Sequence, residues 1–183
     1  MPASIKPESD RSDQSAVRIE LWAEGDLPLL KKLLGDPAMT EHLGGPESDE
    51  QLANRHARYL RLVASGNDRV FKIIHQPTGE SVGSVSYWER TWHGEQVYEI
   101  GWSVIPAFQG RGIARAATSL AIINARSDGK HRFLHAFPSV DNPPSNALCR
   151  SLGFTLIEEC EFEYPAGSFM RCNDWCLDLS ASS

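Results

Sequence analysis

The sequence lacks long apolar runs and is poor in cysteine, and each absence excludes a class of protein. No stretch of the 183 residues approaches the roughly 18 consecutive apolar residues that a membrane-spanning helix requires. Residues 1–16 contain no apolar segment of the kind that a secretory signal has. The four cysteines are too sparse for a disulfide framework and do not have the spacing of zinc ligands. We therefore expect a cytoplasmic protein with reduced thiols, no bound metal and no association with a membrane.

The sequence also lacks the basic excess of a nucleic-acid-binding protein. The 18 Lys and Arg residues are outnumbered by 24 Asp and Glu residues, which gives a net charge of −6. A general nucleic-acid-binding protein needs a basic face that displaces counterions, so nucleic acid is not expected as a partner. The length favours one domain. We expect that domain over residues 17–179, between a flexible tail at 1–16 and a short tail at 180–183.

Hydrophobic periodicity predicts a mixed α/β sheet in this single domain. Alternating or apolar segments that end at turn residues predict strands over 17–23, 69–75, 80–90, 97–104, 132–137, 154–164 and 169–179. Helical patterns lie between the first and second strands, between the fourth and fifth, and between the fifth and sixth. The chain has no internal repeat and no linker.

Four helices are predicted, and three of them have a capping residue before them and a glycine after them. The caps are Asp26, Ser48 and Asn142, and the corresponding stop residues are Gly35, Gly66 and Gly153. The remaining helix covers residues 111–126. Its spacing predicts an inner face of Ile113, Ala117, Leu120 and either Ile123 or Asn124.

The strongest chemical signal is the segment Gln-Gly-Arg-Gly-Ile-Ala at 109–114, between a predicted strand and a predicted helix. Gly110 and Gly112 have no Cβ, so the backbone can approach a ligand closely. The first turn of a helix leaves about four N–H groups unpaired at the positive end of the macrodipole, which suits a phosphate or pyrophosphate. The P-loop Gly-Lys-Ser/Thr and the third glycine of the dinucleotide fingerprint are both missing. On these residues alone, a plain glycine turn is an equal alternative.

Two motifs together resemble the GNAT acetyltransferase superfamily. Gln109-x-x-Gly112-x-Ala114 follows the strand that contains Glu-Ile-Gly-Trp, and it is similar to that family's coenzyme A pyrophosphate motif. Residues 142–154 (Asn-Pro-Pro-Ser-Asn-Ala-Leu-Cys-Arg-Ser-Leu-Gly-Phe) resemble its second cofactor segment. The similarity extends over residues 17–179, and it is strongest to the branch of ribosomal-protein N-terminal acetyltransferases and small-molecule acetyltransferases. It implies a mostly antiparallel sheet of about seven strands with helices on both faces, splayed between the fourth and fifth strands.

The resemblance implies that acetyl-CoA is the cosubstrate and that its acetyl group passes directly to a primary amine. The pantetheine arm is expected between strands 97–104 and 132–137, against the main chain near Val104, where a strand N–H would stabilise the oxyanion. The residues that the resemblance assigns to the cofactor are Trp102, Ser103, Val104, Gln109, Gly110, Arg111, Gly112, Ile113, Ala114, Arg115, Asn142 and Ser145.

Glu99 is the first choice for the base that removes a proton from the amine. Strand alternation places it with Gly101 and Ser103, on the face opposite Tyr98 and Ile100. Members of the family often carry a glutamate on this strand in that role. An ordinary strand glutamate that is solvated or paired with an arginine is an equal alternative. Glu89 and His135 are weaker candidates, and a histidine among apolar residues is more often a hydrogen-bonded core residue.

Cys149 occupies the position at which many members of the family have a tyrosine that protonates the leaving thiolate. The Cys149 thiol or water could supply this proton, and a covalent route through acetyl-Cys149 is a remote alternative because no base is placed beside it. Ser145 is expected to bind the cofactor near these reacting groups. The missing tyrosine also leaves open a non-catalytic acyl-CoA-binding sensor domain.

Acidic residues are dense where the family binds its acceptor, and they favour a small cationic amine over a peptide N-terminus. They are Glu41, Glu47, Asp49, Glu50, Glu89, Glu95, Glu161 and Glu163. Of the tryptophans, Trp88 and Trp92 are expected nearest the acceptor, in a segment that we predict to be a loop. The oligomeric state stays open, and a homodimer is one expectation.

Overall fold

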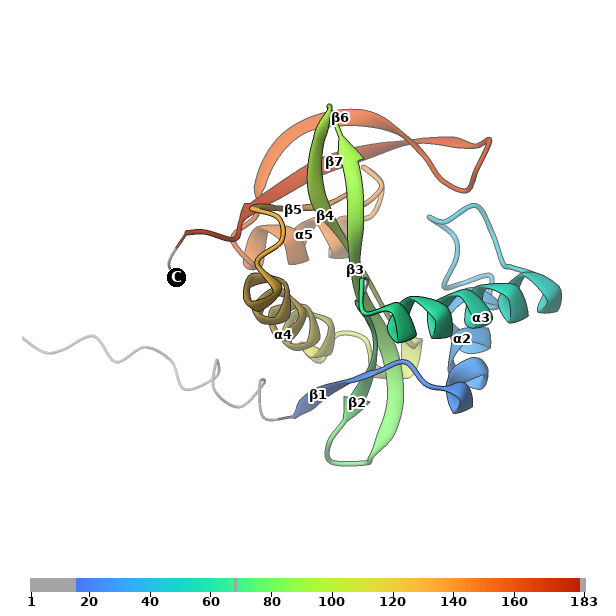
Figure 1. The fold of residues 1–183 in the computed structure, drawn as a ribbon. Coiled ribbons are helices and arrows are strands. Elements are labelled where there is room, and N and C mark those ends of the chain that lie inside the picture. Colours follow the sequence, from blue (N-terminus) through green and yellow to red (C-terminus); the bar gives the residue numbers. More distant parts are fainter. Residues whose placement is uncertain (1–15, 68, 182–183) are drawn as a thin grey trace, which may run out of the picture.

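The computed structural model describes residues 16–67 and 69–181, and it contains one seven-stranded sheet (Figure 1). Most of the two predicted tails therefore lies outside the described residues. The strands are β1 (Val17–Leu21), β2 (Arg69–His75), β3 (Glu80–Trp92), β4 (Glu95–Val104), β5 (Phe133–Ala136), β6 (Thr155–Glu163) and β7 (Phe169–Asp178). Their order in the sheet is β1-β2-β3-β4-β5-β7-β6, and every neighbouring pair is antiparallel except β4 and β5. This topology confirms the predicted fold class.

Helices cover both faces of the sheet. They are α2 (Leu27–Leu34), α3 (Asp49–Ser65), α4 (Ile113–Asp128) and α5 (Pro143–Ser151), with short 3₁₀ turns η1 (Glu24–Asp26) and η2 (Pro106–Phe108). In Figure 1, α4 lies on one side of β3 and β4, and α2 and α3 lie on the other. Among the described residues, no helix has both the length and the apolar character to cross a membrane.

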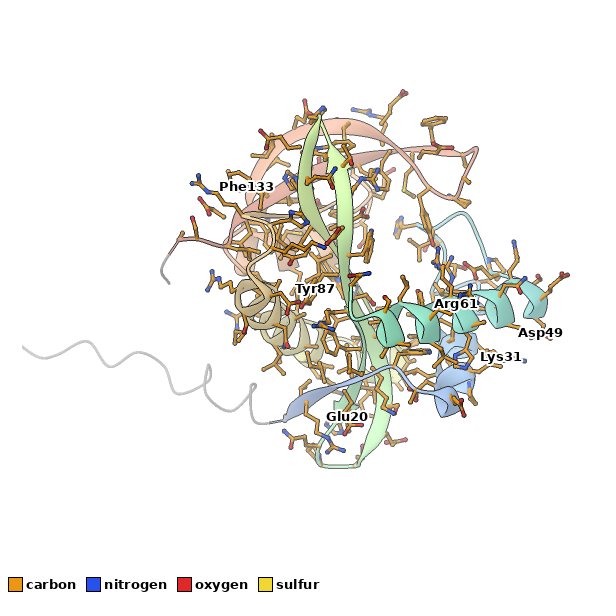
Figure 2. The ribbon with its side chains drawn as sticks, viewed as in Figure 1. Glu20, Lys31, Asp49, Arg61, Tyr87 and Phe133 are labelled. Carbon is orange, nitrogen blue, oxygen red and sulfur yellow. The ribbon has the colours of Figure 1, made fainter. Side chains whose placement is uncertain are left out.

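Each face has its own hydrophobic core. On one face, Tyr87, Tyr98 and Ile100 of the central strands pack against Ala117 and Ala121 of α4. Figure 2 labels Tyr87, whose hydroxyl donates a 2.5 Å hydrogen bond to Asp128 at the end of α4. On the other face, Trp22 after β1 and Val70 of β2 pack with buried leucines of α2 and α3, which are Leu29, Leu30, Leu33 and Leu52. The strand face that carries Glu99 is thus the one on which α2 and α3 lie.

The predicted inner face of α4 is partly wrong. Ile113 and Ala117 are buried as expected, but the buried row continues through Ala121 and Ala125, and Ile123 is 56% exposed. Alanines have no side chain beyond Cβ, so they let a helix lie close to a sheet. The helix therefore packs against the sheet largely through its small residues.

Two of the three predicted caps are confirmed. The Ser48 side chain accepts the Gln51 amide (3.3 Å) while the Gln51 side chain accepts the Ser48 amide (2.8 Å), which is a complete capping box for α3. Asn142 caps α5 by a single bond, in which its side chain accepts the Ser145 amide. Asp26 occupies the N-cap position of α2 as predicted, but its side chain makes no capping hydrogen bond. Its carboxylate accepts the Ala23 amide and pairs with Lys72 of β2, so it joins η1 to the sheet.

Candidate active site

The sheet opens between β4 and β5, because these two strands pair at only two positions. Tyr98 is opposite Leu134 and Glu99 is opposite His135, and β4 then continues to Val104 beside no strand on that side within the described part of the chain. We call Ile100–Val104 the free edge of β4. This opening confirms the predicted splay between the fourth and fifth strands.

The free edge directs particular main-chain groups into the opening. The amide of Ile105 donates to the Val82 carbonyl of β3 (2.9 Å), so it is not available to a ligand. Backbone groups alternate in direction along a strand, so the amides of Trp102 and Val104 are directed away from β3, toward the opening. The main-chain groups of Ser103 to Ile105 were predicted to bind pantetheine. Of their amides, that of Val104 has the suitable direction, as does that of Trp102, whereas those of Ser103 and Ile105 are directed toward β3.

The glycine turn follows directly after the free edge and starts α4. Gly110 and Gly112 have φ values of 71° and 75°, a left-handed conformation that favours glycine. Gly112 is the N-cap of α4, and no side chain among the described residues caps that helix. The Gln109 side chain donates to the Val104 carbonyl (2.8 Å) and so ties the turn to the end of β4. An uncapped helix N-terminus with left-handed glycines fits a pyrophosphate.

The segment around α5 is held by buried polar contacts. The Asn142 side chain accepts the Ser145 amide (3.2 Å). Asn146, which the sequence did not single out, is buried and accepts hydrogen bonds from Trp175 and Asn173 of β7, at 2.8 Å each. These bonds fix the start of α5 on β7. No sequence pattern within α5 indicates its partners, because they lie 27 and 29 residues further along the chain.

Cys149 is fully buried in the core between α5 and the sheet. Burial raises the pKa of its thiol to about 12. A thiol ordinarily has a pKa of about 8.5, so Cys149 holds its proton more tightly than the thiolate of coenzyme A would bind it. Burial thus disfavours Cys149 as the proton donor, and the role of this residue stays a prediction.

Glu99 lies at the last paired position before the opening and is only 8% exposed. Arg90 of β3 donates from Nη1 to Glu99 Oε2 at 2.7 Å, and the side chain of Trp88 also hydrogen-bonds the carboxylate. Burial raises the pKa of Glu99, and the Arg90 charge opposes this rise. Pairing with an arginine, which was the alternative to a base role, is therefore observed. The carboxylate is also buried beside the opening between β4 and β5.

His135 is a hydrogen-bonded core histidine on the same face. Its Nδ1 lies 2.6 Å from Asp174 Oδ1, and the other carboxylate oxygen of Asp174 accepts the Trp92 indole N–H at 2.9 Å. Burial opposes the charge on His135, but the bonds to Asp174 and Cys176 and the Asp174 charge outweigh it and raise the pKa to about 9. Asp174 is 1% exposed, and the sequence reasoning missed it. Its only signal was an acid within the alternating strand 169–179.

Glu89 does not lie with Glu99 and His135, because it is on the other face of the sheet. It is adjacent in sequence to Arg90 and therefore lies on the opposite face of β3, where it pairs with Lys130 after α4. Trp88 and Trp92 do lie on the Glu99 face, because Trp88 is directly opposite Glu99 in the β3–β4 pair. They belong to strand β3 and not to the loop that we predicted.

The turn between β6 and β7 reaches the segment between α2 and α3. A Cβ on Gly44 would lie 2.8 Å from Cδ of Pro165, so these two segments are in close contact. Arg55 of α3 pairs with Glu47 and donates to the Tyr164 hydroxyl at 3.4 Å. Figure 1 shows this turn beside the segment that precedes α3. The two segments together form a bridge on the Glu99 side of the sheet.

Several acids that were expected to attract a cationic acceptor have basic partners. Glu47 pairs with Arg55, Glu89 with Lys130, and Asp49 with Lys31 at 2.9 Å; Lys31 and Asp49 are labelled in Figure 2. Glu163 accepts the Gly167 amide within the β6–β7 turn. The positive charge of these partners offsets part of the negative potential that the sequence count implies.

Comparison with known families finds an acetyltransferase (GNAT) domain over residues 17–155. A search of curated proteins finds no match. The structure is similar to an acetyltransferase from Salmonella typhimurium described as modifying the N-terminal serine of ribosomal protein L7/L12, with 22% identity and a TM-score of 0.73 over 90% of this chain and 95% of that one.

Two further solved structures have the same fold. Spermidine N-acetyltransferase from Vibrio cholerae, in complex with CoA and spermine, has 17% identity and a TM-score of 0.75 over 91% of this chain and 97% of that one. A putative acetyltransferase (yncA) from Salmonella typhimurium, with acetyl-CoA, has 24% identity and a TM-score of 0.73 over 92% and 96%. At these identities the likeness shows a common fold and leaves the acceptor open.

Proposed function

The chain belongs to the GNAT acetyltransferase family, and we propose that it transfers the acetyl group of acetyl-CoA directly to the primary amine of a small acceptor. The observation that carries the proposal is the opening between β4 and β5, which leads from the buried Glu99 to the uncapped N-terminus of α4. The cosubstrate fits this path: pantetheine lies along the free edge of β4, and the pyrophosphate lies at the glycine turn.

The main chain supplies the binding and polarising groups. The N–H groups at the start of α4, beside Gly110 and Gly112, bind the pyrophosphate, with Arg111 and Arg115 on the same turn. The amides of Trp102 and Val104 bind the pantetheine arm. One of them donates to the acetyl carbonyl and stabilises the negative charge that develops on its oxygen.

Glu99 takes the proton that the attacking nitrogen loses. A free alkylamine is protonated at neutral pH and becomes a nucleophile only as the neutral base. The raised pKa of Glu99, caused by burial, makes its carboxylate a stronger base than an exposed one. The nitrogen attacks the thioester carbon, the C–S bond breaks as the carbonyl reforms, and the thiolate takes a proton from water. Glu99 passes the first proton to solvent before the attack, so its carboxylate is free to accept the second nitrogen proton and to release that one to solvent as well.

The bridge between the β6–β7 turn and the α2–α3 segment supports a small acceptor. Contacts at Gly44 and Pro165 and at Arg55 and Tyr164 join the two segments on the side from which the amine approaches. A slender molecule passes such a bridge more readily than a folded protein surface does. A free amine is cationic in solution, and the net charge of −6 still favours its approach.

A panel of amines, assayed by thiol release from acetyl-CoA, tests the proposal. The panel contains polyamines, amino sugars, amino acids and short peptides with free N-termini, each at low and high salt. We expect turnover with a small amine and an apparent affinity that falls as salt is raised. Turnover with peptides alone, without salt dependence, would replace the small acceptor by a protein N-terminus. Acyl-CoA binding without turnover would indicate a sensor domain.

A further inference from the structure

The guanidinium of Arg90 occupies a box of three aromatic rings next to Glu99. Its Cζ lies 4.3 Å from the ring centroid of Phe162, 5.4 Å from that of Trp92 and 5.5 Å from that of Phe137. The rings also contact one another, with centroids 4.7 Å apart for Trp92 and Phe137 and 4.6 Å apart for Phe137 and Phe162. The three rings come from β3, from the residue after β5, and from β6, so three elements fix one cation. We call these rings the aromatic box.

Stability does not explain this arrangement well. The Glu99 side chain is 10% exposed and that of Arg90 is 29% exposed, so both charges are largely removed from water. Among the described residues, the buried Nε–H of Arg90 has no hydrogen-bond acceptor. A buried ion pair is often no more stabilising than apolar residues of the same volume, and an unsatisfied buried donor adds a further cost. A functional role would account for the arrangement in spite of this cost.

Within residues 16–67 and 69–181, the other groups that face Glu99 offer no equivalent cation. His135 of β5 is paired with Glu99 in register, but its Nδ1 is bound to Asp174 of β7, whose charge offsets its own. Cys172 of β7 is a neutral thiol whose pKa burial raises, to about 11. The indole of Trp88 donates a hydrogen bond without a net charge. Arg90 is therefore the cation that compensates the Glu99 carboxylate directly.

We propose that Arg90 is a positioning residue for acetyl transfer: held in the aromatic box, its guanidinium keeps the buried Glu99 carboxylate ionised and fixed at the opening between β4 and β5. The inference rests on the proposed function, in which Glu99 is the base. A carboxylate buried without a counter-charge would take up a proton and could no longer accept one from the amine. The aromatic box restricts the movement of the long arginine side chain. The ion pair of Arg90 with Glu99 therefore stays formed when the amine binds.

Carbon-13 NMR of the full chain, labelled at the glutamate carboxyl carbons, tests this role without requiring turnover. The Glu99 resonance is identified as the one that Glu99→Gln removes. An opposite charge at this distance lowers the pKa of a carboxyl group by about 1–3 units, so Arg90→Met should raise the Glu99 midpoint by about that amount. Arg90→Lys keeps the charge but not the planar group, and it should raise the midpoint less. Arg171→Met, which breaks an exposed pair with Glu159, is the matched control and should leave the midpoint unchanged.

Kinetics then connect the midpoint to catalysis. The acidic limb of kcat/KM against pH should move upward with the NMR midpoint in Arg90→Met and recover in part in Arg90→Lys. An unchanged Glu99 midpoint in folded Arg90→Met overturns the inference. If that variant fails to fold, Phe162→Leu loosens the box instead, and an unchanged midpoint there overturns it equally. Unimpaired turnover in Glu99→Gln removes the base role and the inference with it. Absence of transfer to every amine overturns the proposed function, whereas the NMR result still decides whether Arg90 controls the charge of Glu99.

Discussion

Replacement of Gly112 by aspartate places one negative charge at the point where we expect the pyrophosphate of acetyl-CoA. Gly112 is the N-cap of α4 with φ near 75°, so any other residue there is strained by roughly 1–2 kcal/mol, and Asp and Asn tolerate the conformation better than most. Strain therefore affects Asp and Asn alike. Charge affects only Asp: at roughly 5 Å, and with an effective dielectric constant between about 20 and 80, each phosphate charge is repelled by about 1–3 kcal/mol.

Isothermal titration calorimetry with coenzyme A on Gly112→Asp and Gly112→Asn separates the two effects. We expect Gly112→Asp to bind coenzyme A about 5- to 150-fold more weakly than Gly112→Asn does. This ratio corresponds to the repulsion of about 1–3 kcal/mol. Because the repulsion is electrostatic, the ratio should shrink in about 1 M salt, where the Debye length is about 3 Å. Both variants should melt at similar temperatures. Equal affinities of the Asp and Asn variants at low salt would refute the assignment of the pyrophosphate to this turn.

Three further predictions concern the groups on the Glu99 face and on α5. Glu99→Gln removes a proton acceptor without changing shape, so kcat/KM should fall by about 10²–10⁴ at pH 7 and recover in part at high pH; loss of less than tenfold would argue against a base. Cys149→Ser should reduce kcat by less than about tenfold, because a thiol with a pKa raised to about 12 is a poor acid, and mass spectrometry should find no acetyl-enzyme. The pKa of His135 is raised to about 9, above the unfolded value of about 6.5, so the protonated residue stabilises the native state below pH 6.5 and this contribution is lost between pH 6.5 and 9. Denaturant unfolding should therefore show that His135→Gln is most destabilising near pH 6 and less so near pH 9.5, and a constant difference would contradict the Asp174 pair.

Local signals in the sequence predicted most of the fold and the glycine turn at which we expect the cofactor. The capping box at Ser48 and the N-cap at Asn142 each join residues that are three positions apart in the sequence. Both patterns can therefore be recognised without tertiary information. Gly110 and Gly112 were singled out because they have no Cβ, and the structure shows both in the left-handed conformation. The sequence also placed Glu99 on the correct face, because strand alternation has a strict period of two.

The partners of these residues could not be predicted, because they depend on which strands become neighbours. Arg90 and Glu99 meet across the β3–β4 hairpin, and Asp174 meets His135 across 39 residues of chain. The face of α4 that packs against the sheet was also predicted wrongly in part. Hydrophobicity favoured Ile123 for the inner face, whereas close packing on the sheet required small residues such as Ala121. Isoleucines and alanines are neighbours in the sequence of α4. The helical period alone therefore does not determine which of them face the sheet.

The transfer itself is tested most directly by following an isotopically labelled acetyl group. The wild-type chain is incubated with acetyl-CoA carrying carbon-13 in its acetyl group and with the best small amine of the panel, and both product and intact protein are analysed by mass spectrometry. We predict that the label appears on the amine nitrogen in step with thiol release and that the protein stays unmodified, with Glu99→Gln slowing both signals together. Label on Cys149 that is later passed to the amine, or thiol release without any labelled amine, would contradict direct transfer.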